Sequence, residues 1–203
     1  MRNTFDRFNG RHQDYQAARP SYAQEFLDWL GELYAPPERY TAADIGSGTG
    51  KLSAQLLAAG FRVCGVEPNP DMRGAAEALL GGDPRFSSSN GTDHDTGLPD
   101  RSVDMVAAAQ AFHWFDGPAF ARECRRILRP GGRAVLVWNV RGSAPMNQAL
   151  AQVFREHCPS FHGFTGGMGE DDPRIRDFFG GAYEKRRFPN PLTLDRDQFL
   201  RRC

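Results

Sequence analysis

One short segment constrains the fold of this chain more than any other. The run Thr41–Ile45 leads without a break into Gly46-Ser-Gly-Thr-Gly50, and residues 51–59 follow with leucines at helical spacing until Gly60. Strand, glycine loop and helix in this order are typical of α/β proteins that bind a phosphate or a nucleotide over the loop. The segment therefore predicts a nucleotide site, with an ordinary glycine-rich turn as the alternative interpretation of the loop alone.

The spacing of the glycines separates three kinds of nucleotide loop. A P-loop needs glycine at position 45 and serine or threonine at 52, where this chain has Ile45 and Leu52. The dinucleotide pattern needs its third glycine at position 51, which is Lys51 here. The loop thus favours a nucleoside without a pyrophosphate. Glu67, which ends the second predicted strand, can accept both hydroxyls of a ribose, although a solvated loop acid is the other interpretation.

The rest of the chain continues the alternation of helices and strands. Asn69-Pro70 supplies an N-cap and a first-turn proline for the next helix, and Asp195 and Gln198 match a capping box. Helices are expected over 21–34, 51–59, 71–80, 120–128 and 146–154, and strands over 41–45, 61–66, 85–89, 102–109, 134–138 and, at an edge, 183–188. A tight turn is expected at Arg129-Pro-Gly-Gly132. This order predicts a parallel sheet with right-handed crossovers.

Length and charge bound the kinds of partner. The chain has 203 residues, with 25 Lys+Arg against 25 Asp+Glu, so we expect one globular domain and no nucleic-acid partner. No apolar run is long enough to cross a bilayer, and the first residues lack the apolar centre of a signal peptide, which predicts a cytoplasmic protein without membrane contact. The scattered cysteines predict reduced thiols, with Cys64 and Cys124 buried, rather than disulfides or a metal site.

Five segments carry a family resemblance. They are Asp44-Ile-Gly-Ser-Gly-Thr-Gly50, Val66-Glu67-Pro-Asn, Leu98-Pro-Asp-Arg-Ser-Val-Asp104, Ala109-Gln-Ala-Phe-His-Trp-Phe115 and Leu128-Arg-Pro-Gly-Gly132. In this order they resemble the class I S-adenosylmethionine-dependent methyltransferases, and the nearest group is the small-molecule enzymes similar to trans-aconitate methyltransferase. The stretch from Tyr15 to Tyr22 is similar to the leader of that group.

The resemblance implies an α/β, Rossmann-like, doubly wound and mostly parallel sheet with helices on both faces. It implies a single methyltransferase domain over 1–203, with an N-terminal leader and lid helix over 1–38, a cofactor-binding core over 39–140 and a partial C-terminal cap over 141–203. The antiparallel final strand of the family is expected to be missing, because the sequence ends a few residues after the start of a predicted helix. Either the chain is truncated, which would leave one edge of the sheet open, or the cap of the family is reduced here.

The resemblance also implies S-adenosylmethionine as the cofactor. The loop glycines would let the backbone touch its methionine and ribose parts, and Glu67 would take the ribose hydroxyls. Asp93 stands where the family binds the adenine edge, although many relatives have a small residue and then Glu at positions 93 and 94. Met72 suits either the adenine ring or the helix core. Arg19 would pair the cofactor carboxylate or remain at the surface. The predicted cofactor residues are Arg19, Asp44, Gly46, Ser47, Gly48, Gly50, Glu67, Pro68, Met72, Asp93 and Gln110.

Methyl transfer is an in-line displacement at a carbon bonded to cationic sulfur, so the protein supplies alignment and a dry pocket, and no metal is required. His113 is the candidate catalytic residue because it can take a proton from an oxygen or nitrogen nucleophile near neutral pH; packing beneath a lid is its other interpretation. A carboxylate acceptor needs no base, and Arg141 could then hold a second carboxylate or be an exposed charge. Trp114 and Asn139 complete the predicted substrate residues.

Aromatic and glycine-rich segments suggest how the acceptor is enclosed. Phe112, Trp114, Phe115 and Trp138 cluster at predicted strand ends and suit a wall near the sulfonium or the core, the core being expected for Phe112 and Phe115. The loop over 161–168 has the glycines and apolar anchors of a lid. Nothing in these segments identifies the acceptor.

The predicted function is methyl transfer from S-adenosylmethionine to an oxygen, such as that of a carboxylate, or to a nitrogen of a small molecule. A nicotinamide-dependent oxidoreductase is an alternative, against which Lys51 argues. A cofactor-binding protein without turnover is another, favoured by the absent final strand. The neutral charge argues against a nucleic-acid acceptor. The sequence makes no prediction about oligomeric state.

Overall fold

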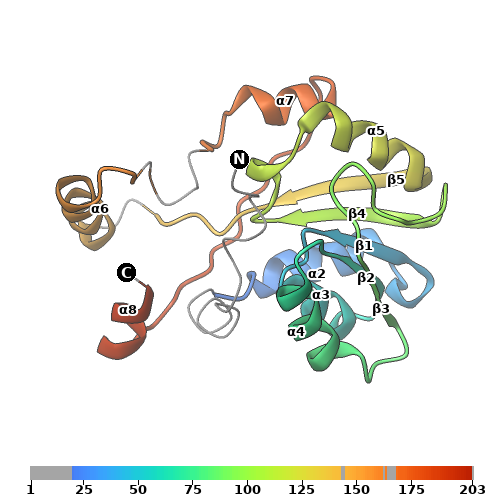
Figure 1. Cartoon of the computed structure of the whole chain (residues 1–203), viewed down its shortest axis with the longest axis horizontal. Coiled ribbons are helices and arrows are strands. Elements are labelled where there is room, and N and C mark those ends of the chain that lie inside the picture. Colours follow the sequence, from blue (N-terminus) through green and yellow to red (C-terminus); the bar gives the residue numbers. More distant parts are fainter. Residues whose placement is uncertain (1–19, 143–144, 162, 164–167, 203) are drawn as a thin grey trace.

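Five parallel strands form the centre of the structure, a computed structural model that describes residues 20–142, 145–161, 163 and 168–202. The strands are β1 (Thr41–Ile45), β2 (Arg62–Val66), β3 (Phe86–Ser89), β4 (Val103–Ala109) and β5 (Leu128–Val137). They lie in the order β3-β2-β1-β4-β5, and every neighbouring pair is parallel. Helices lie on both sides of the sheet (Figure 1), which confirms the predicted α/β, doubly wound architecture.

Two apolar layers hold several of the helices to the sheet. The helices are α2 (Gln24–Leu33), α3 (Lys51–Ala58), α4 (Pro70–Leu80), α5 (Gly117–Ile127), α6 (Pro145–His157), α7 (Pro173–Phe179) and α8 (Arg196–Arg202), with short 3-10 turns η2 (Pro37–Arg39) and η3 (Phe112–Trp114). Ala42 of β1 packs with α2 and α3, whereas Ala43 packs on the opposite face with α5 and α7. This alternation follows from the two-residue period of a strand.

Local capping signals act as the sequence predicts. The Oδ1 atom of Asn69 accepts hydrogen bonds from the backbone N–H groups of Asp71 and Met72, both at 3.0 Å, at the start of α4. At the start of α8, the N–H of Gln198 donates to Asp195 Oδ1 at 2.8 Å and the N–H of Asp195 donates to Gln198 Oε1 at 3.1 Å. The second pair is the reciprocal bonding of a capping box.

The fifth strand starts earlier than predicted. The Arg129-Pro-Gly-Gly132 segment is predicted as a turn before the strand, yet pairing with β4 already begins at Leu128. The register shifts between Val103 and Met105, so the extra residues form an irregularity within β5. Gly131 has a φ of +83°, a conformation that L side chains rarely adopt. The glycines therefore mark a bulge inside the strand.

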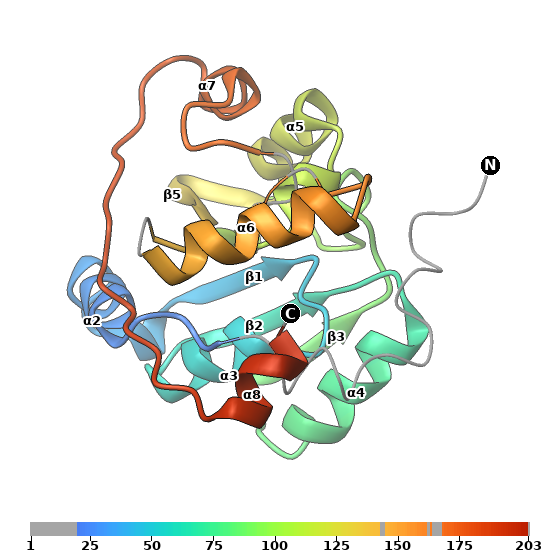
Figure 2. The same ribbon diagram turned by 90° about the vertical axis from the view of Figure 1, so that its left-hand side faces the viewer.

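The predicted edge strand over 183–188 is wrong. Residues 182–194, here called the C-terminal strap, are extended but pair with no strand of the described chain, and they run from α7 past α2 towards α8 (Figure 2). Phe188 packs on Phe26 and Trp29 of α2, with ring centroids 5.8 and 5.9 Å apart. The apolar side chain of the strap is thus buried against a helix, which removes the need for a neighbouring strand.

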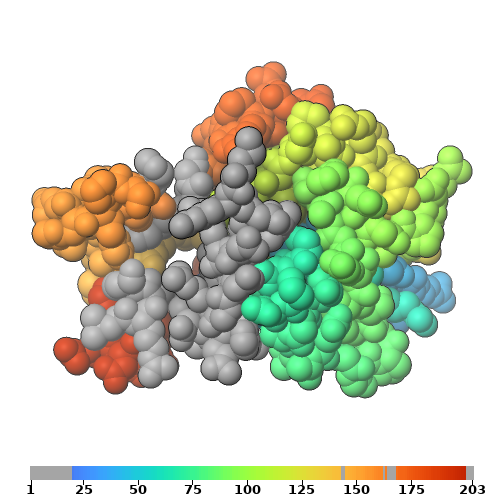
Figure 3. All heavy atoms as spheres, in the orientation of Figure 1, coloured from blue at the N-terminus to red at the C-terminus, as the bar shows by residue number. Residues whose placement is uncertain are grey.

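Two helices differ from expectation in other ways. The sequence reasoning assigned no helix to α7, but Phe178 of α7 stacks on Phe120 of α5 with centroids 5.1 Å apart. The predicted helix over 146–154 is confirmed as α6, which has no buried residue. Figure 3 shows α6 standing out at one side of the molecule. Packing against α5 therefore stabilises α7, whereas α6 buries no side chain.

The burial predicted for two cysteines is confirmed. Cys64 and Cys124 are buried free thiols, and burial raises the pKa of each. In the parts of the chain that the structure describes, no three His, Cys, Asp or Glu side chains are grouped to hold a metal ion. No helix among the described residues has the length and apolarity to span a membrane.

Candidate functional site

A narrow cleft lies at the carboxyl ends of β1 and β4. The strand order reverses direction between these two strands, and open α/β sheets bind their ligands at such a point. The enclosed volume is ≈ 50 Å³. The lining residues are Pro20, Tyr22, Asp44, Gly46, Ser47, Gly48, Thr49, Lys51, Leu52, Ala109, Gln110 and Asn139. The cleft therefore brings the predicted glycine loop together with Gln110 and Asn139.

The glycine loop shapes one wall of the cleft. Gly46, Gly48 and Gly50 all have positive φ, at +69°, +56° and +80°. A Cβ atom on Gly46 would lie 2.8 Å from the Cβ of Ala111, whereas a Cβ on Gly48 would meet no atom within 4 Å. Gly46 is therefore needed for close packing, and the backbone at Gly48 is left open to a ligand.

Asp44 is a buried carboxylate at the base of the cleft, with 1% of its surface exposed. Its Oδ2 atom accepts a hydrogen bond from the Ser53 hydroxyl at 2.7 Å, while Oδ1 has no partner among the described residues. Burial raises the pKa of Asp44 to about 6, against the lowering effect of the Ser53 bonds. An unpaired buried oxygen is costly, so this atom points to a ligand that donates a hydrogen bond.

Glu67 joins the end of β2 to the glycine loop. Its Oε2 atom accepts from the N–H of Gly48 at 3.0 Å, and Oε1 accepts from the N–H of Asn69 at 2.9 Å. Burial raises the pKa of Glu67, and these two bonds oppose that shift. The carboxylate is only 8% exposed and is not among the residues that line the enclosed cleft. It lies at the edge of the cleft, held in a fixed orientation.

Gln110 and Asn139 form the opposite rim. Gln110 has a φ of +55°, unusual for a residue with a side chain, and its Nε2 donates to the carbonyl of Asn139 at 3.1 Å. Asn139 Nδ2 donates to the carbonyl of Ser21 at 3.3 Å, and Asn190 of the strap donates to Asn139 Oδ1 at 2.9 Å. Asn139 therefore ties β5, the start of the described chain and the strap together at the cleft.

The residues predicted for the adenine end lie outside the enclosed cleft. Met72 is 3% exposed, and Pro68 is half-buried beside Glu67. Asp93 Oδ2 accepts a hydrogen bond from the N–H of Asp116 at 3.0 Å, and its other oxygen lies 3.1 Å from His94 Nδ1. Asp93 is thus fixed to the start of α5.

The aromatic cluster divides between core and surface. Phe112 is 2% exposed, which confirms its predicted core position, whereas Phe115 is partly buried and packs against the core. Trp138 also packs on Phe112. His113 lies beside Trp114, with ring centroids 4.8 Å apart, and Trp114 is 48% exposed. Neither His113 nor Trp114 lines the enclosed cleft. Their neighbours Ala111 and Phe115 approach Gly46 of the glycine loop.

Arg141 lies in a separate, open groove of ≈ 460 Å³. Its lining residues are Arg141, Gly142, Asn147, Gln148, Ala151, Gln152 and Arg155. The groove contains two arginines and no acidic residue, so an anion suits it better than a cation. Because Arg141 follows Asn139 by two residues, the groove begins next to the rim of the cleft.

Some site residues were missed by the sequence reasoning, and others fall outside the described chain. Tyr22 lines the cleft and exchanges two backbone hydrogen bonds with the Gln55 side chain, at 2.9 and 3.0 Å. Lys51 and Asn190 were also missed, because only the fold places them at the cleft. Arg19 and most of the predicted lid over 161–168 lie outside the described residues.

Known proteins share this architecture and much of this sequence. A model of the methyltransferase domain family matches residues 43–136, the region from β1 to β5. An uncharacterized methyltransferase of Mycobacterium tuberculosis is 42% identical over 127 residues, which cover 63% of this chain and 49% of that protein. A methyltransferase-like protein of Schizosaccharomyces pombe is 32% identical, over 73% of this chain and 59% of that protein. The chain thus spans about half the length of the mycobacterial relative.

Solved structures give the same result. A protein of Anaeromyxobacter dehalogenans, described as a type II methyltransferase, is 32% identical with a TM-score of 0.54, and the match covers 87% of this chain and 70% of that one. A protein of Anabaena variabilis, described as a methyltransferase from an antibiotic biosynthesis pathway, shares the fold at 24% identity and a TM-score of 0.62, over 82% of this chain and 63% of that one.

Proposed function

The chain belongs to the methyltransferase domain family, with S-adenosylmethionine as its cofactor, and we propose that it transfers the methyl group of this cofactor to an oxygen or nitrogen of a small molecule. When bound, the cofactor supplies a methyl group on a cationic sulfur, which carries the chemical drive of the reaction. The residues of the chain then have to bind the cofactor, align the acceptor with its methyl group and exclude water.

The unpartnered Oδ1 of Asp44 is the observation that carries this proposal. It is a buried acceptor that lines the cleft, and the methionine part of the cofactor ends in an ammonium group that can donate to it. A hydrogen bond between charged partners is stronger than a neutral one, so this contact would contribute much of the affinity. The open backbone at Gly48 leaves room for the chain of atoms that leads to the ribose.

The size of the cleft supports an extended binding mode. Pockets that hold small molecules have volumes of roughly 300–1,000 Å³, whereas the enclosed part of this cleft has ≈ 50 Å³. We therefore place only the methionine end in the enclosed part. The ribose would lie across the edge at Glu67, whose fixed carboxylate can accept from both hydroxyls. The adenine ring would lie beyond Glu67, near Pro68, Met72 and Asp93.

The acceptor would bind on the side of Gln110. A neutral hydroxyl or amine must lose a proton, and His113 is the group we assign to receive it. A carboxylate acceptor arrives ionised, and the arginines of the neighbouring groove, Arg141 and Arg155, favour such an anion. Asn139 holds the rim rather than the acceptor, because its side chain already bonds Ser21 and Asn190. Trp114, half-exposed beside His113, would cover the acceptor.

Calorimetric titration with three ligands tests the proposal. S-adenosylhomocysteine and S-adenosylmethionine carry the ammonium group, and 5′-methylthioadenosine lacks the amino acid part. We expect Asp44→Asn to weaken binding of the first two by roughly tenfold or more and to leave the third unchanged. Asp177→Asn, an exposed change on α7, is the matched control. Binding of NAD in place of all three would contradict the proposal.

An acceptor screen tests the transfer itself. The protein and S-adenosylmethionine are incubated with small carboxylic acids, phenols and amines, and methylated product is detected by mass spectrometry. With a hydroxyl or amine acceptor, His113→Ala should lower kcat strongly; with a carboxylate it should not. Cofactor binding without any methylated product across the screen would favour a protein that binds the cofactor without turnover.

A further inference from the structure

The segment after β3, residues 90–98, forms the far end of the proposed cofactor site. The N–H of Glu67 donates to the carbonyl of Ser89 at 3.1 Å, so the strand ends at Glu67 and Ser89 are neighbours. Arg73 Nη1 donates to the carbonyl of Glu67 at 2.8 Å and to Asn90 Oδ1 at 3.1 Å. A ligand that extends from the cleft across Glu67 therefore reaches this segment next.

The segment contains no helix or strand, so contacts fix its shape. It folds back on itself: a Cβ on Gly91 would lie only 2.5 Å from the carbonyl oxygen of Thr96. Within this turn of the segment, the N–H of Thr92 donates to the carbonyl of Asp95 at 2.8 Å. Because the backbones of Gly91 and Thr96 lie this close, a displacement of Thr96 should also move the residues between them, Asp93 included.

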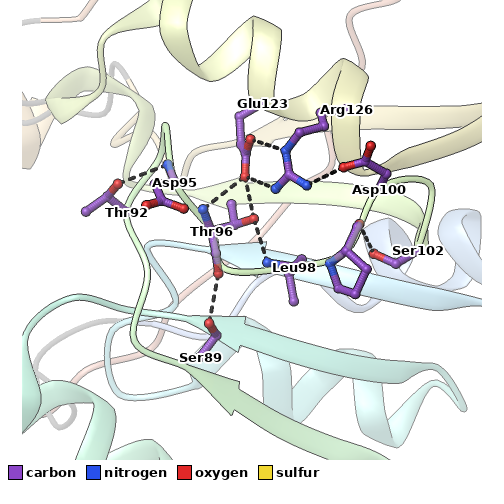
Figure 4. Close-up of polar contacts among 10 residues, drawn as sticks. Ser89, Thr92, Asp95, Thr96, Leu98, Asp100, Ser102, Glu123 and Arg126 are labelled. Atoms are coloured by element: carbon purple, nitrogen blue, oxygen red, sulfur yellow. Dashed lines mark hydrogen bonds and ion pairs between the residues drawn. The ribbon is translucent and has the colours of Figure 1, made fainter.

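Thr96 is held by a carboxylate from α5 (Figure 4). Glu123 Oε1 accepts from the Thr96 N–H at 2.9 Å and from the Thr96 hydroxyl at 2.6 Å. The Thr96 hydroxyl accepts from the N–H of Leu98 at 3.2 Å, and the Thr96 carbonyl accepts from the Ser89 hydroxyl at 2.8 Å. All polar groups of Thr96 are therefore engaged, and Thr96 is 0% exposed.

Glu123 is itself fixed and charged. Arg126 donates to its two oxygens at 2.7 and 2.8 Å and also to Asp100 at 2.7 Å. Burial raises the pKa of Glu123, but the bonds from Arg126 and Thr96 outweigh this effect and hold the pKa at about 2. The carboxylate is 6% exposed, so loss of its charge would weaken its buried bonds to Arg126 and to the two donors of Thr96.

A second bond from α5 reaches the same segment. Asp116 caps α5, with its Oδ1 accepting from the N–H of Ala119 at 3.0 Å, and the N–H of Asp116 donates to Asp93 Oδ2 at 3.0 Å. The helix thus holds the segment at Asp93 and at Thr96. Neither Glu123 nor Asp116 lines the enclosed cleft.

We propose that Glu123 is a positioning residue for cofactor recognition: through Thr96 it sets the segment 90–98 so that Asp93 meets the amino group on the adenine ring. This inference rests on the proposed function. It requires that loss of Glu123 weaken recognition of the adenine edge and leave the methionine end unaffected, since Asp44 and Gly48 belong to other elements.

The test compares two ligands that differ only at that edge. S-inosylhomocysteine carries a carbonyl oxygen where S-adenosylhomocysteine carries the amino group, so it cannot donate to Asp93 from that position, and its ring N1–H lies one atom further along the edge. We expect the native protein to bind S-adenosylhomocysteine roughly tenfold more tightly than the inosine analogue. In Glu123→Gln most of this ratio should vanish, with the affinity for the inosine analogue nearly unchanged. Circular dichroism and thermal unfolding confirm that each variant is folded.

A second pair of variants tests the positioning role of Glu123 if Glu123→Gln does not fold. Thr96→Val removes the 2.6 Å bond without a change in size and should lower the ratio, whereas Thr96→Ser keeps the hydroxyl and should restore it. An unchanged ratio in folded Glu123→Gln or Thr96→Val, or an equal loss of affinity for both ligands, overturns the role of Glu123 while the proposed function stands. Failure of the native protein to bind either ligand overturns both.

Discussion

At position 44 the chain buries a carboxylate whose pKa is raised by burial from 3.8 to about 6. The folded protein therefore holds this proton more tightly than the unfolded chain does. The associated stability is fully present below about pH 4 and is lost as pH rises through about 6. We expect Asp44→Asn to raise the free energy of unfolding by about 3 kcal/mol at pH 8 and by less at pH 5. Urea unfolding at both pH values measures the difference; an equal gap at both would contradict this assignment.

The ionisation of Asp44 also controls the affinity for the ligand. Because the ammonium group needs an ionised partner, the Kd of S-adenosylhomocysteine should rise below pH 6, by up to about tenfold per pH unit. The pKa of Glu67 is also raised by burial, so its protonation has to be separated from that of Asp44. Binding of 5′-methylthioadenosine, which keeps the ribose and lacks the ammonium group, isolates the effect of Glu67. The interpretation fails if both ligands lose affinity in parallel.

Gly48 and Gly131 form a matched pair for a test of the glycine loop. Both have positive φ, +56° and +83°, and at both an added Cβ would meet no atom within 4 Å. Alanine at either position should cost about 1–2 kcal/mol of stability for the left-handed backbone. Only Gly48→Ala should abolish binding of S-adenosylhomocysteine, since its Cβ would enter the cleft. Calorimetry and urea unfolding measure both; equal binding by the two variants would place the ligand elsewhere.

At the scale of elements, α7 is held by aromatic packing that its sequence pattern does not predict. Phe178 stacks on Phe120 and lies 5.2 Å from Phe112, measured between ring centroids. Phe178→Ala should therefore lower the free energy of unfolding by about 3–5 kcal/mol. Phe179→Ala, at the half-buried neighbour, should cost clearly less. Chemical denaturation checks both, and similar losses in the two variants would argue against the packing described.

Element prediction succeeded where the signal is local. The Asn69-Pro70 start of α4 and the Asp195–Gln198 pair of α8 lie within four residues of the bonds they make. Element prediction failed for the strap and for the bulge of β5. For the strap, an extended apolar segment has the same sequence pattern whether it pairs with a strand or packs on a helix. Which occurs at Phe188 depends on Trp29, far away in sequence.

At the scale of the whole molecule, stability is unevenly distributed. The cleft joins β1, β4, the glycine loop and the strap, whereas α6 has no buried residue. Saturation with S-adenosylhomocysteine at 100 times its Kd should stabilise the domain by about 2.7 kcal/mol. Hydrogen exchange should slow in β1, β4 and α3 and stay fast in α6, with or without the ligand. Protection that spreads equally to α6 would contradict this division.

The sequence by itself determined the parallel α/β sheet and the glycine loop, and it indicated most of the cofactor residues that we propose. These features depend on periodicity, glycine spacing and capping, which are written in consecutive residues. Only the tertiary structure decided the bond between Glu123 and Thr96 and the bond between Asn139 and Asn190, whose partners lie 27 and 51 residues apart in the chain. A hydrogen bond between distant residues leaves no periodic trace, because it depends on which elements the sheet order places side by side.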